Sequence, residues 1–161
     1  MKRFMKRVAN SSGFGFVILD ETGMELYRIQ GDSDKLKQRL YMTDRTGVIV
    51  SEILHGSFML HFFSVRCRKG LYVLLPSVRE CFSFTIYGSS YRFAGDLGTG
   101  RFSMYDVDKS TVLTQKKCWT AFGEGYELEV FRSEQEIFAL SVAVCAAMYL
   151  TGAEEKTVLS G

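Results

Sequence analysis

The segment from Ser133 to Leu150, with the sequence SEQEIFALSVAVCAAMYL, constrains the fold of this chain more than any other. Ser133 and Glu136 form the S-x-x-E pattern of a helix capping box, and no charged residue occurs from Ile137 to Ala153. A helix that is apolar on every side has to be buried, either in a protein core or in a membrane. The sequence therefore predicts a buried helix over about 134–150.

Two features of this helix favour a protein core over a membrane span. Its uncharged run is at the short end of the roughly 20 apolar residues that a spanning helix needs. Alanines make it thin, and its ends carry glutamates in place of the basic and Trp anchors that are typical of spans. We therefore predict no transmembrane span. The structural core residues that we expect on this helix are Ile137, Leu140, Val144 and Met148.

The chain before this helix is predicted to form short strands joined by tight turns. The fraction of aromatic residues, 14%, favours β structure. A D-x-T-G pattern occurs at 20–23 and again at 44–47, which indicates a faint internal repeat of hairpins. Alternating apolar and polar residues between turns mark about 12 strands. The predicted strands are 4–8, 16–20, 24–30, 35–43, 48–54, 58–68, 71–75, 79–87, 91–95, 101–107, 111–118 and 126–131.

About twelve strands and one wholly apolar helix have few compact arrangements. An open sheet would expose two edges and could not surround a helix, whereas a closed barrel has no edges and encloses an apolar interior. A barrel of about 12 strands is too wide to be filled by its own side chains. We therefore predict a mainly β fold: a closed antiparallel barrel around the central C-terminal helix, in one domain of residues 1–153, followed by a short tail at 154–161.

Cysteine usage and the N-terminus bear on the cellular compartment. The cysteines are Cys67, Cys81, Cys118 and Cys145, and no two of them form a C-x-x-C pair. Basic residues interrupt the N-terminal segment, where a signal peptide would need a continuous apolar region. These features predict reduced thiols in a cytoplasmic protein, which could also lie peripherally on a membrane.

The order of several local strings resembles the LURP-one-related family within the tubby C-terminal-like superfamily. The resemblance covers about residues 3–150. The strings, in order, are FVILDETGMELYRIQGD, KLKQRLYMTDRTGVIVSEI, YRFAGDLGTGRFSMYD, TVLTQKKCWTAFGEGYELEVF and EQEIFALSVAVCAAMYL. The resemblance implies a tubby C-terminal-like barrel around a hydrophobic helix. It implies function only loosely: tubby domains bind phosphoinositides, and phospholipid scramblases are relatives at the level of the fold.

Some short patterns resemble functional motifs but lack residues that the chemistry needs. His55 and His61 have no cysteine or acid at zinc-ligand spacing, so we predict no metal site and no cofactor. Residues 13–17 resemble part of an RNA-recognition motif, yet Ser12 replaces its basic first residue and Leu19 its last aromatic. The chain has no paired-acid motif and no glycine-rich nucleotide loop. We therefore predict that it is not an enzyme.

Clusters of Lys and Arg remain as candidates for function. Residues 1–119 hold 18 Lys and Arg against 11 Asp and Glu, so the strand region carries the positive charge. Alternate residues of a strand share a face, which would align Arg66 with Arg68. The candidate ligand-binding residues are Lys35, Lys37, Arg39, Arg66, Arg68, Lys69, Lys116 and Lys117. The alternative interpretation is that these cations only solvate the faces and edges of the sheet.

Three functional hypotheses follow from these clusters. The first is a non-catalytic protein that binds anionic phospholipid or phosphoinositide headgroups at a basic outer face. A protein-interaction scaffold is the alternative, and it predicts an exposed aromatic patch. Nucleic-acid binding is less favoured and predicts steep salt dependence with base stacking on exposed Tyr or Phe. For folding, Ala143→Arg or Ala147→Arg should abolish soluble protein, because an unpaired charge would lie inside the barrel.

Overall fold

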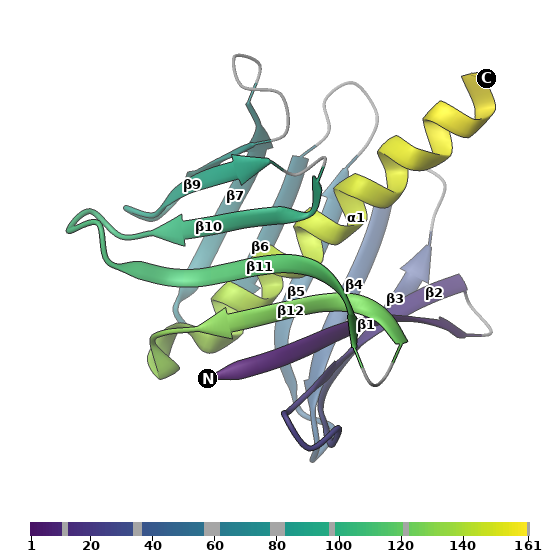
Figure 1. Ribbon diagram of the computed structural model, residues 1–161, viewed down its shortest axis with the longest axis horizontal. Helices are drawn as coiled ribbons and strands as arrows, with labels where there is room; N and C mark the ends of the chain where they lie inside the picture. Colours follow the sequence, from purple (N-terminus) through teal and green to yellow (C-terminus); the bar gives the residue numbers. More distant parts are fainter. Residues whose placement is uncertain are drawn as a thin grey trace.

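The computed structural model describes residues 1–10, 13–33, 37–56, 62–77, 83–96, 99–120 and 123–160. Within these ranges the chain forms twelve strands, a short 3-10 helix and one α-helix (Figure 1). The strands are β1 (Lys2–Asn10), β2 (Gly13–Leu19), β3 (Glu25–Ser33), β4 (Lys37–Asp44), β5 (Ile49–Gly56), β6 (Phe62–Cys67), β7 (Gly70–Pro76), β8 (Phe84–Tyr87), β9 (Arg92–Asp96), β10 (Arg101–Tyr105), β11 (Thr111–Thr120) and β12 (Gly123–Val130). The helices are η2 (Ser133–Gln135) and α1 (Glu136–Ser160).

The strands form one antiparallel sheet that curls into a nearly closed barrel. Each strand pairs with its sequence neighbour and β1 pairs with β12, which gives the order β8-β7-β6-β5-β4-β3-β2-β1-β12-β11-β10-β9. This confirms the predicted barrel of about 12 antiparallel strands. Its one seam among the described residues lies between β8 and β9, the two ends of the strand order. The Phe84 and Phe93 rings meet across this seam with centroids 5.6 Å apart. Aromatic side chains thus cover what hydrogen bonds leave open.

The predicted strands all have counterparts, and their bounds differ where the sequence pattern extends past the ladder. Of the predicted strand 79–87, the described part forms β8 at Phe84–Tyr87. Predicted strand residues 35–36, 58–61 and 79–82 lie outside the described residues. Alternation explains why the described segments form strands: in β8 the side chains alternate between buried and exposed, which suits a sheet with one face in the core.

The two D-x-T-G turns have the same geometry, which confirms the predicted repeat. The backbone N–H and hydroxyl of Thr22 donate to Asp20 Oδ1 at 2.8 and 2.6 Å. Those of Thr46 donate to Asp44 Oδ1 at the same distances. Gly47 has a φ of +83°, a left-handed conformation that L side chains rarely adopt. The aspartate fixes each turn, and the glycine lets the chain reverse into the next strand.

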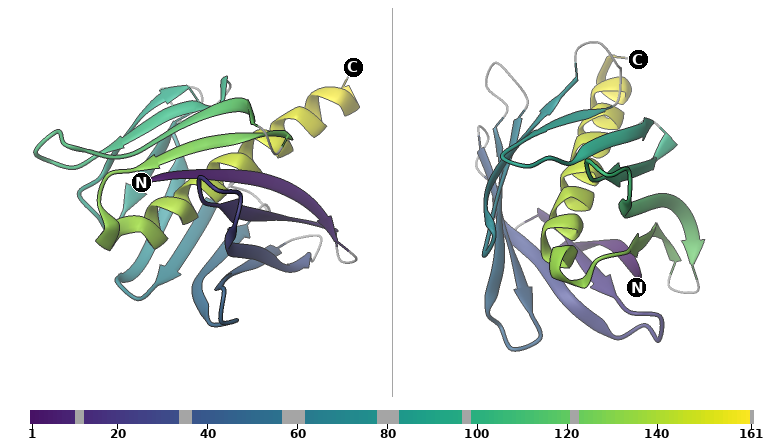
Figure 2. Two further views of the ribbon diagram at one scale, coloured as in Figure 1. Left: turned by 60° about the horizontal axis from the view of Figure 1, so that its bottom comes forward. Right: turned by 90° about the vertical axis from the view of Figure 1, so that its left-hand side faces the viewer.

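Helix α1 passes through the barrel, and Figure 2 shows strands on opposite sides of it. Leu140, Val144 and Met148 are buried, as expected for core positions, while Ile137 is only partly buried. The helix continues to Ser160, whereas the sequence predicted its end near 150 and a tail from 154. The predicted end near 150 rests on the extent of the uncharged run. Such a run indicates which residues are buried and does not indicate where a helix ends. Residues 153–156 are Ala-Glu-Glu-Lys, all strong helix formers, so the helix continues past the apolar core.

The start of α1 also differs from the predicted capping box. Ser133 begins the 3-10 helix η2, and Glu136 is the first residue of α1. The Glu136 carboxylate is used in another contact: Arg3 Nε of β1 donates to its Oε1 at 2.7 Å. Both side chains are largely buried, with 16% and 14% of their surfaces exposed. The first turn of α1 is therefore anchored to the barrel wall by an ion pair.

We call the end of the barrel at which α1 begins the mouth. Successive strands alternate in direction, so every second turn lies at this end, together with Met1, whose ammonium donates to the Val130 carbonyl. Among the described residues, the large apolar side chains that are exposed lie at the mouth, with the exception of Trp119. Those at the mouth are Met1, Met24, Val48, Ile49, Leu71, Tyr87, Val107 and Phe131.

Candidate functional site

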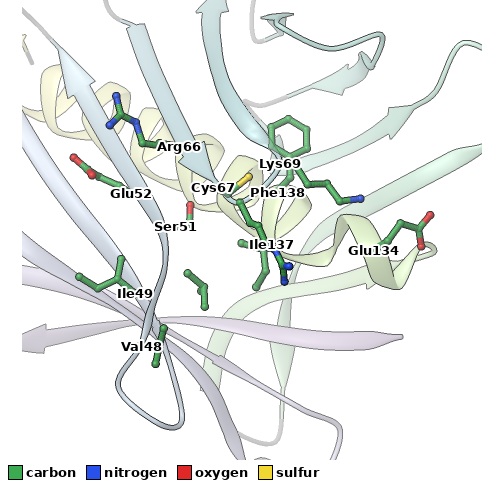
Figure 3. A pocket seen from close by; sticks show the side chains of 12 residues that line it. Val48, Ile49, Ser51, Glu52, Arg66, Cys67, Lys69, Glu134, Ile137 and Phe138 are labelled. Carbon is green, nitrogen blue, oxygen red and sulfur yellow. The ribbon is translucent and has the colours of Figure 1, made fainter.

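A groove of about 930 Å³ opens at the mouth, between strands β5 and β6 and the first turn of α1 (Figure 3). Val48 to Glu52 form one side of it and Arg66 to Lys69 the next. Glu134, Ile137 and Phe138 form the far side. A volume of this size is at the upper end of the range of small-molecule sites, about 300–1,000 Å³. The groove is therefore the candidate functional site.

Strand register determines which side chains face the groove interior. Ser51 of β5 lies directly opposite Cys67 of β6, and both face α1. Ser51 Oγ lies 2.8 Å from Ser141 Oγ, and Ser141 donates to the Ile137 carbonyl at 2.8 Å. Because the single Ser141 proton is used there, Ser51 must be the donor between the two hydroxyls. The polar floor of the groove thus has its donors satisfied within the protein.

The far wall of the groove is apolar and well supported. The Phe138 ring packs against Tyr72 with centroids 4.2 Å apart and stacks on Tyr91 at 5.6 Å. Burial raises the pKa of Tyr72 and of Tyr91, which keeps both phenols neutral at ordinary pH. Phe138 is 1% exposed, while Ile137 is partly exposed beside it. This wall is held in place by aromatic contacts within the protein.

Two cations stand at the tip of a hairpin on the rim of the groove. Cys67 pairs with Gly70, so Arg68 and Lys69 are the two central residues of the β6–β7 turn. Both side chains are exposed, and among the described residues neither has a carboxylate within ion-pair distance. Lys69 extends across the mouth toward the side where Glu134 lies (Figure 3). The rim therefore carries positive charge that the fold leaves available.

The structure corrects the predicted alignment of Arg66 with Arg68. Strand β6 ends at Cys67, so Arg68 lies in the turn and does not share a strand face with Arg66. Arg66 lies directly opposite Glu52, on the face of the sheet opposite to Ser51 and Cys67. The sequence pattern missed this difference because a strand end is set by the ladder and not by alternation.

The other predicted cations contact carboxylates or lie outside the residues that the structure describes. Arg39 Nε is 3.5 Å from Glu52 Oε1, on the outer face. Lys116 and Lys117 pair with Glu127 and Glu124 at 3.6 and 3.2 Å. Lys35, and the side chain of Lys37, lie outside the described residues. The eight candidates thus do not form one surface. Of the described ones, Arg66, Arg68 and Lys69 border the groove, Arg66 from strand β6 and the other two from the β6–β7 turn.

Several side chains of types that can bind metals or act in catalysis make structural contacts here. His55 stacks on Phe63 with centroids 4.3 Å apart, and His61 lies outside the described residues. Burial raises the pKa of the Cys145 thiol inside α1, which leaves it an inert small apolar group. Hydrogen bonds from Thr22 and Thr46 hold the pKa values of Asp20 and Asp44 below the usual value. These shifts belong to the turns and the core.

Sequence reasoning did not find the groove, although one signal pointed to it. Val48 and Ile49 directly follow the turn at 44–47, where a solvent-exposed strand end normally carries polar residues. Both are more than half exposed, at 57% and 58%, and so is Leu71 at 54%. In the sequence alone, an apolar pair after a hairpin turn predicts only the start of a strand. Only the folded arrangement shows that it borders an opening beside α1.

The nearly closed barrel around one helix, with a groove at its mouth, defines the class of protein. The sequence model of the LURP-one-related family matches residues 1–148. The chain therefore belongs to the LURP-one-related family, which confirms the resemblance seen in its motifs.

Two known proteins are similar to this chain over nearly its whole length. Uncharacterized protein YxjI of Bacillus subtilis (strain 168) is 26% identical over 161 residues, which cover 96% of this chain and 97% of that protein. The X-ray structure of the Arabidopsis thaliana protein AT5G01750 matches with a TM-score of 0.52 and 15% identity, covering 91% of both chains. The second likeness concerns the fold alone.

The structure also bears on the predicted absence of a membrane span. In the part of the chain that the structure describes, no helix combines the length and apolar character that crossing a membrane requires.

Proposed function

We propose that this protein is a non-catalytic module that binds anionic phospholipid headgroups, phosphoinositides included, with its mouth against a membrane surface. The observation that supports this most is the juxtaposition of Arg68 and Lys69, which lack carboxylate partners among the described residues, with the exposed side chains of Val48, Ile49 and Leu71. The cations and the apolar groups all come from the ends of strands β5 to β7, so one flat surface can contact them together.

This combination matches what a peripheral membrane site requires. A Lys or Arg near an anionic bilayer contributes about 1 kcal/mol, which is weak alone and screened by salt. Apolar side chains that enter the interfacial region add a second contribution, and stable attachment generally needs two such signals. The proposed binding site is therefore the rim of the mouth, a smaller region than the basic outer face that the sequence predicted. The cations of β11 are excluded from the proposal because Glu124 and Glu127 lie against them.

Cosedimentation with vesicles tests this function. The purified protein is mixed with neutral vesicles and with vesicles that contain anionic phospholipid, at low and high salt. Binding should be confined to anionic vesicles and should weaken with salt. The Arg68→Ala/Lys69→Ala variant should bind roughly 30-fold less, because two cations at about 1 kcal/mol each are lost.

The chain offers a matched control, Lys116→Ala/Lys117→Ala. It removes the same charge from a surface where both cations already face carboxylates, so vesicle binding should stay within twofold of the unmodified protein. Equal losses in the two variants would show only a dependence on net charge and would contradict a defined site. Absence of binding to every vesicle would also overturn the proposal and direct the search to protein partners, beginning with Trp119, which is 81% exposed.

A further inference from the structure

The groove at the mouth is larger than a site for an anionic head group alone would need to be, and the side chains of its interior are mainly apolar. We propose that it binds a single hydrocarbon chain with an anionic head group, the chain lying along α1 and the head at Arg68 and Lys69. This inference deepens the proposed function and rests on the same two cations, but it assigns a ligand that enters the protein. The chemistry is shared by a free fatty acid and by one chain of a membrane phospholipid.

The interior surface suits a hydrocarbon chain. Ile49 lies on one side of the groove, and Ile137 and Phe138 lie on the other (Figure 3). Val50 also lines it. The one polar pair on the floor is internally satisfied, because Ser141 donates to the Ile137 carbonyl and Ser51 donates to Ser141. Placing hydrocarbon against hydroxyl groups is usually unfavourable because it buries donors that have no acceptor. A chain over this floor would bury no such donor.

Contacts within the protein hold the walls of the groove in place. Phe138 is held between Tyr72 and Tyr91, and the first turn of α1 is anchored through the Arg3–Glu136 ion pair. The protein need not order these groups when a ligand binds, and such preorganisation reduces the cost of binding. The volume of about 930 Å³ is within the range of small-molecule sites, although the groove is open to solvent on one side.

The charges around the opening select an anionic head. Arg68 and Lys69 project from the hairpin tip and have no carboxylate partner among the described residues. Two acids also border the groove. Glu52 Oε1 lies 3.5 Å from Arg39 Nε on the outer face. Glu134 lies on the opposite side of the opening (Figure 3), and no cation of the described chain is within ion-pair distance of it. Arg66 also borders the groove, directly opposite Glu52. The described residues around the opening therefore carry more positive than negative charge, which favours a negative head group at the β6–β7 turn.

Calorimetric titration with alkyl carboxylates of eight, ten and twelve carbons, each below its micelle concentration, tests the proposal without a membrane. Binding should saturate at one chain per protein. Affinity should rise about tenfold for every two carbons added, since each methylene leaves water on binding. An alkyltrimethylammonium of twelve carbons, with the same chain and the opposite charge, should bind at least tenfold more weakly than the twelve-carbon carboxylate.

Two matched variants separate the groove from general surface stickiness. Ile49→Asp places a carboxylate at the groove wall, in a position exposed enough to tolerate it, and should weaken the twelve-carbon carboxylate at least tenfold. Val107→Asp makes the same change at an exposed apolar residue of the β10–β11 turn, outside the groove, and should leave affinity unchanged. Val48→Asp replaces Ile49→Asp if the latter does not fold. Arg68→Ala/Lys69→Ala should abolish the preference for the anionic head.

Each outcome of these titrations decides the question. Saturable binding that Ile49→Asp weakens and Val107→Asp does not supports the proposal. No saturable binding, equal affinity for both head-group charges, or equal losses in the two aspartate variants overturns it. Vesicle binding without carboxylate binding would leave the proposed function standing and remove the chain-binding groove. Carboxylate binding without vesicle binding would identify a carrier of free fatty acids and remove the membrane function instead.

Discussion

Two pairs of neighbouring cations, Arg68–Lys69 and Lys116–Lys117, look alike in the sequence and differ in their surroundings. The β11 pair lies in the middle of a ladder, where Lys116 is directly opposite Glu127. Each of its lysines lies within 4 Å of a carboxylate. The β6–β7 pair forms a hairpin tip, beyond the last paired residues Cys67 and Gly70. A tip has no opposite strand, so register cannot supply it with a partner.

This difference shows how strand position determines the availability of charge. In a sheet, the residue opposite a cation is fixed by the ladder, and an acid there shields it. A cation at a turn is shielded only by residues of that turn or by another element. Three changes alter the environment of a cation in different ways: burial without a partner, loss of a buried partner, and strain at a turn. Each provides a test of the comparison.

The largest effect is expected when a cation is placed where the barrel supplies neither solvent nor partner. Ala143 is fully buried on α1, and Ala143→Arg should abolish cooperative folding because an unpaired charge inside the core is severely unfavourable. Soluble yield and thermal unfolding followed by circular dichroism measure this. A soluble Ala143→Arg protein with an unchanged melting curve would show that α1 is not the core of the barrel.

The structure separates Ala147→Arg from Ala143→Arg, which the sequence treated alike. Ala147 borders a small pocket of about 180 Å³ that also includes Arg7, Lys117 and Glu124 at the far end of the barrel. Because exposed residues line this pocket, an arginine there could reach solvent, so Ala147→Arg should destabilise less and serves as the comparison variant. Equal loss of folding in both variants would show that this end of the barrel is as closed as its centre.

A smaller effect is expected when a buried cation loses its partner. Arg3→Met removes the 2.7 Å contact with Glu136 and leaves that largely buried carboxylate without its donor. Unfolding free energy measured in urea should fall by about 1–3 kcal/mol. Lys116→Met, which breaks a half-exposed pair, should cost no more than about 1 kcal/mol and is the control. The double variant Arg3→Met/Glu136→Met should recover part of the lost unfolding free energy. A further decrease would show that the unpaired Glu136 carboxylate is not what destabilises Arg3→Met.

The sequence predicted those parts of the fold that depend on local pattern. Alternation in β8 and the paired D-x-T-G turns located strands and reversals, since each depends on a few adjacent residues. The uncharged run from Ile137 located the core helix and, through it, the barrel. Parts that depend on register were not predictable: whether Lys117 faces Glu124, where β6 ends, and that Ile49 comes to border α1.

The smallest effect is expected at Lys109, a third cation whose environment is set by its turn. The β10–β11 turn has the same backbone hydrogen bonds as the turn at 44–47: Asp106 N–H donates to the Ser110 carbonyl at 2.9 Å, and Lys109 N–H to the Asp106 carbonyl at 2.9 Å. Lys109 occupies the position of Gly47, with a φ of +65°. A side chain in this left-handed conformation costs roughly 1–2 kcal/mol.

Lys109→Gly should therefore stabilise the protein, in contrast to the other changes. The relieved strain exceeds the extra chain entropy of glycine, about 0.5–1 kcal/mol, so unfolding free energy should rise by about 0.5–1 kcal/mol and the melting temperature by about 1–4 °C. Lys109→Ala removes the same charge but keeps the Cβ atom, so it should give no gain. If both variants stabilise equally, repulsion by the lysine charge and not backbone conformation limits this turn. Vesicle binding should be unchanged in both, because Lys109 is not among the residues that line the groove.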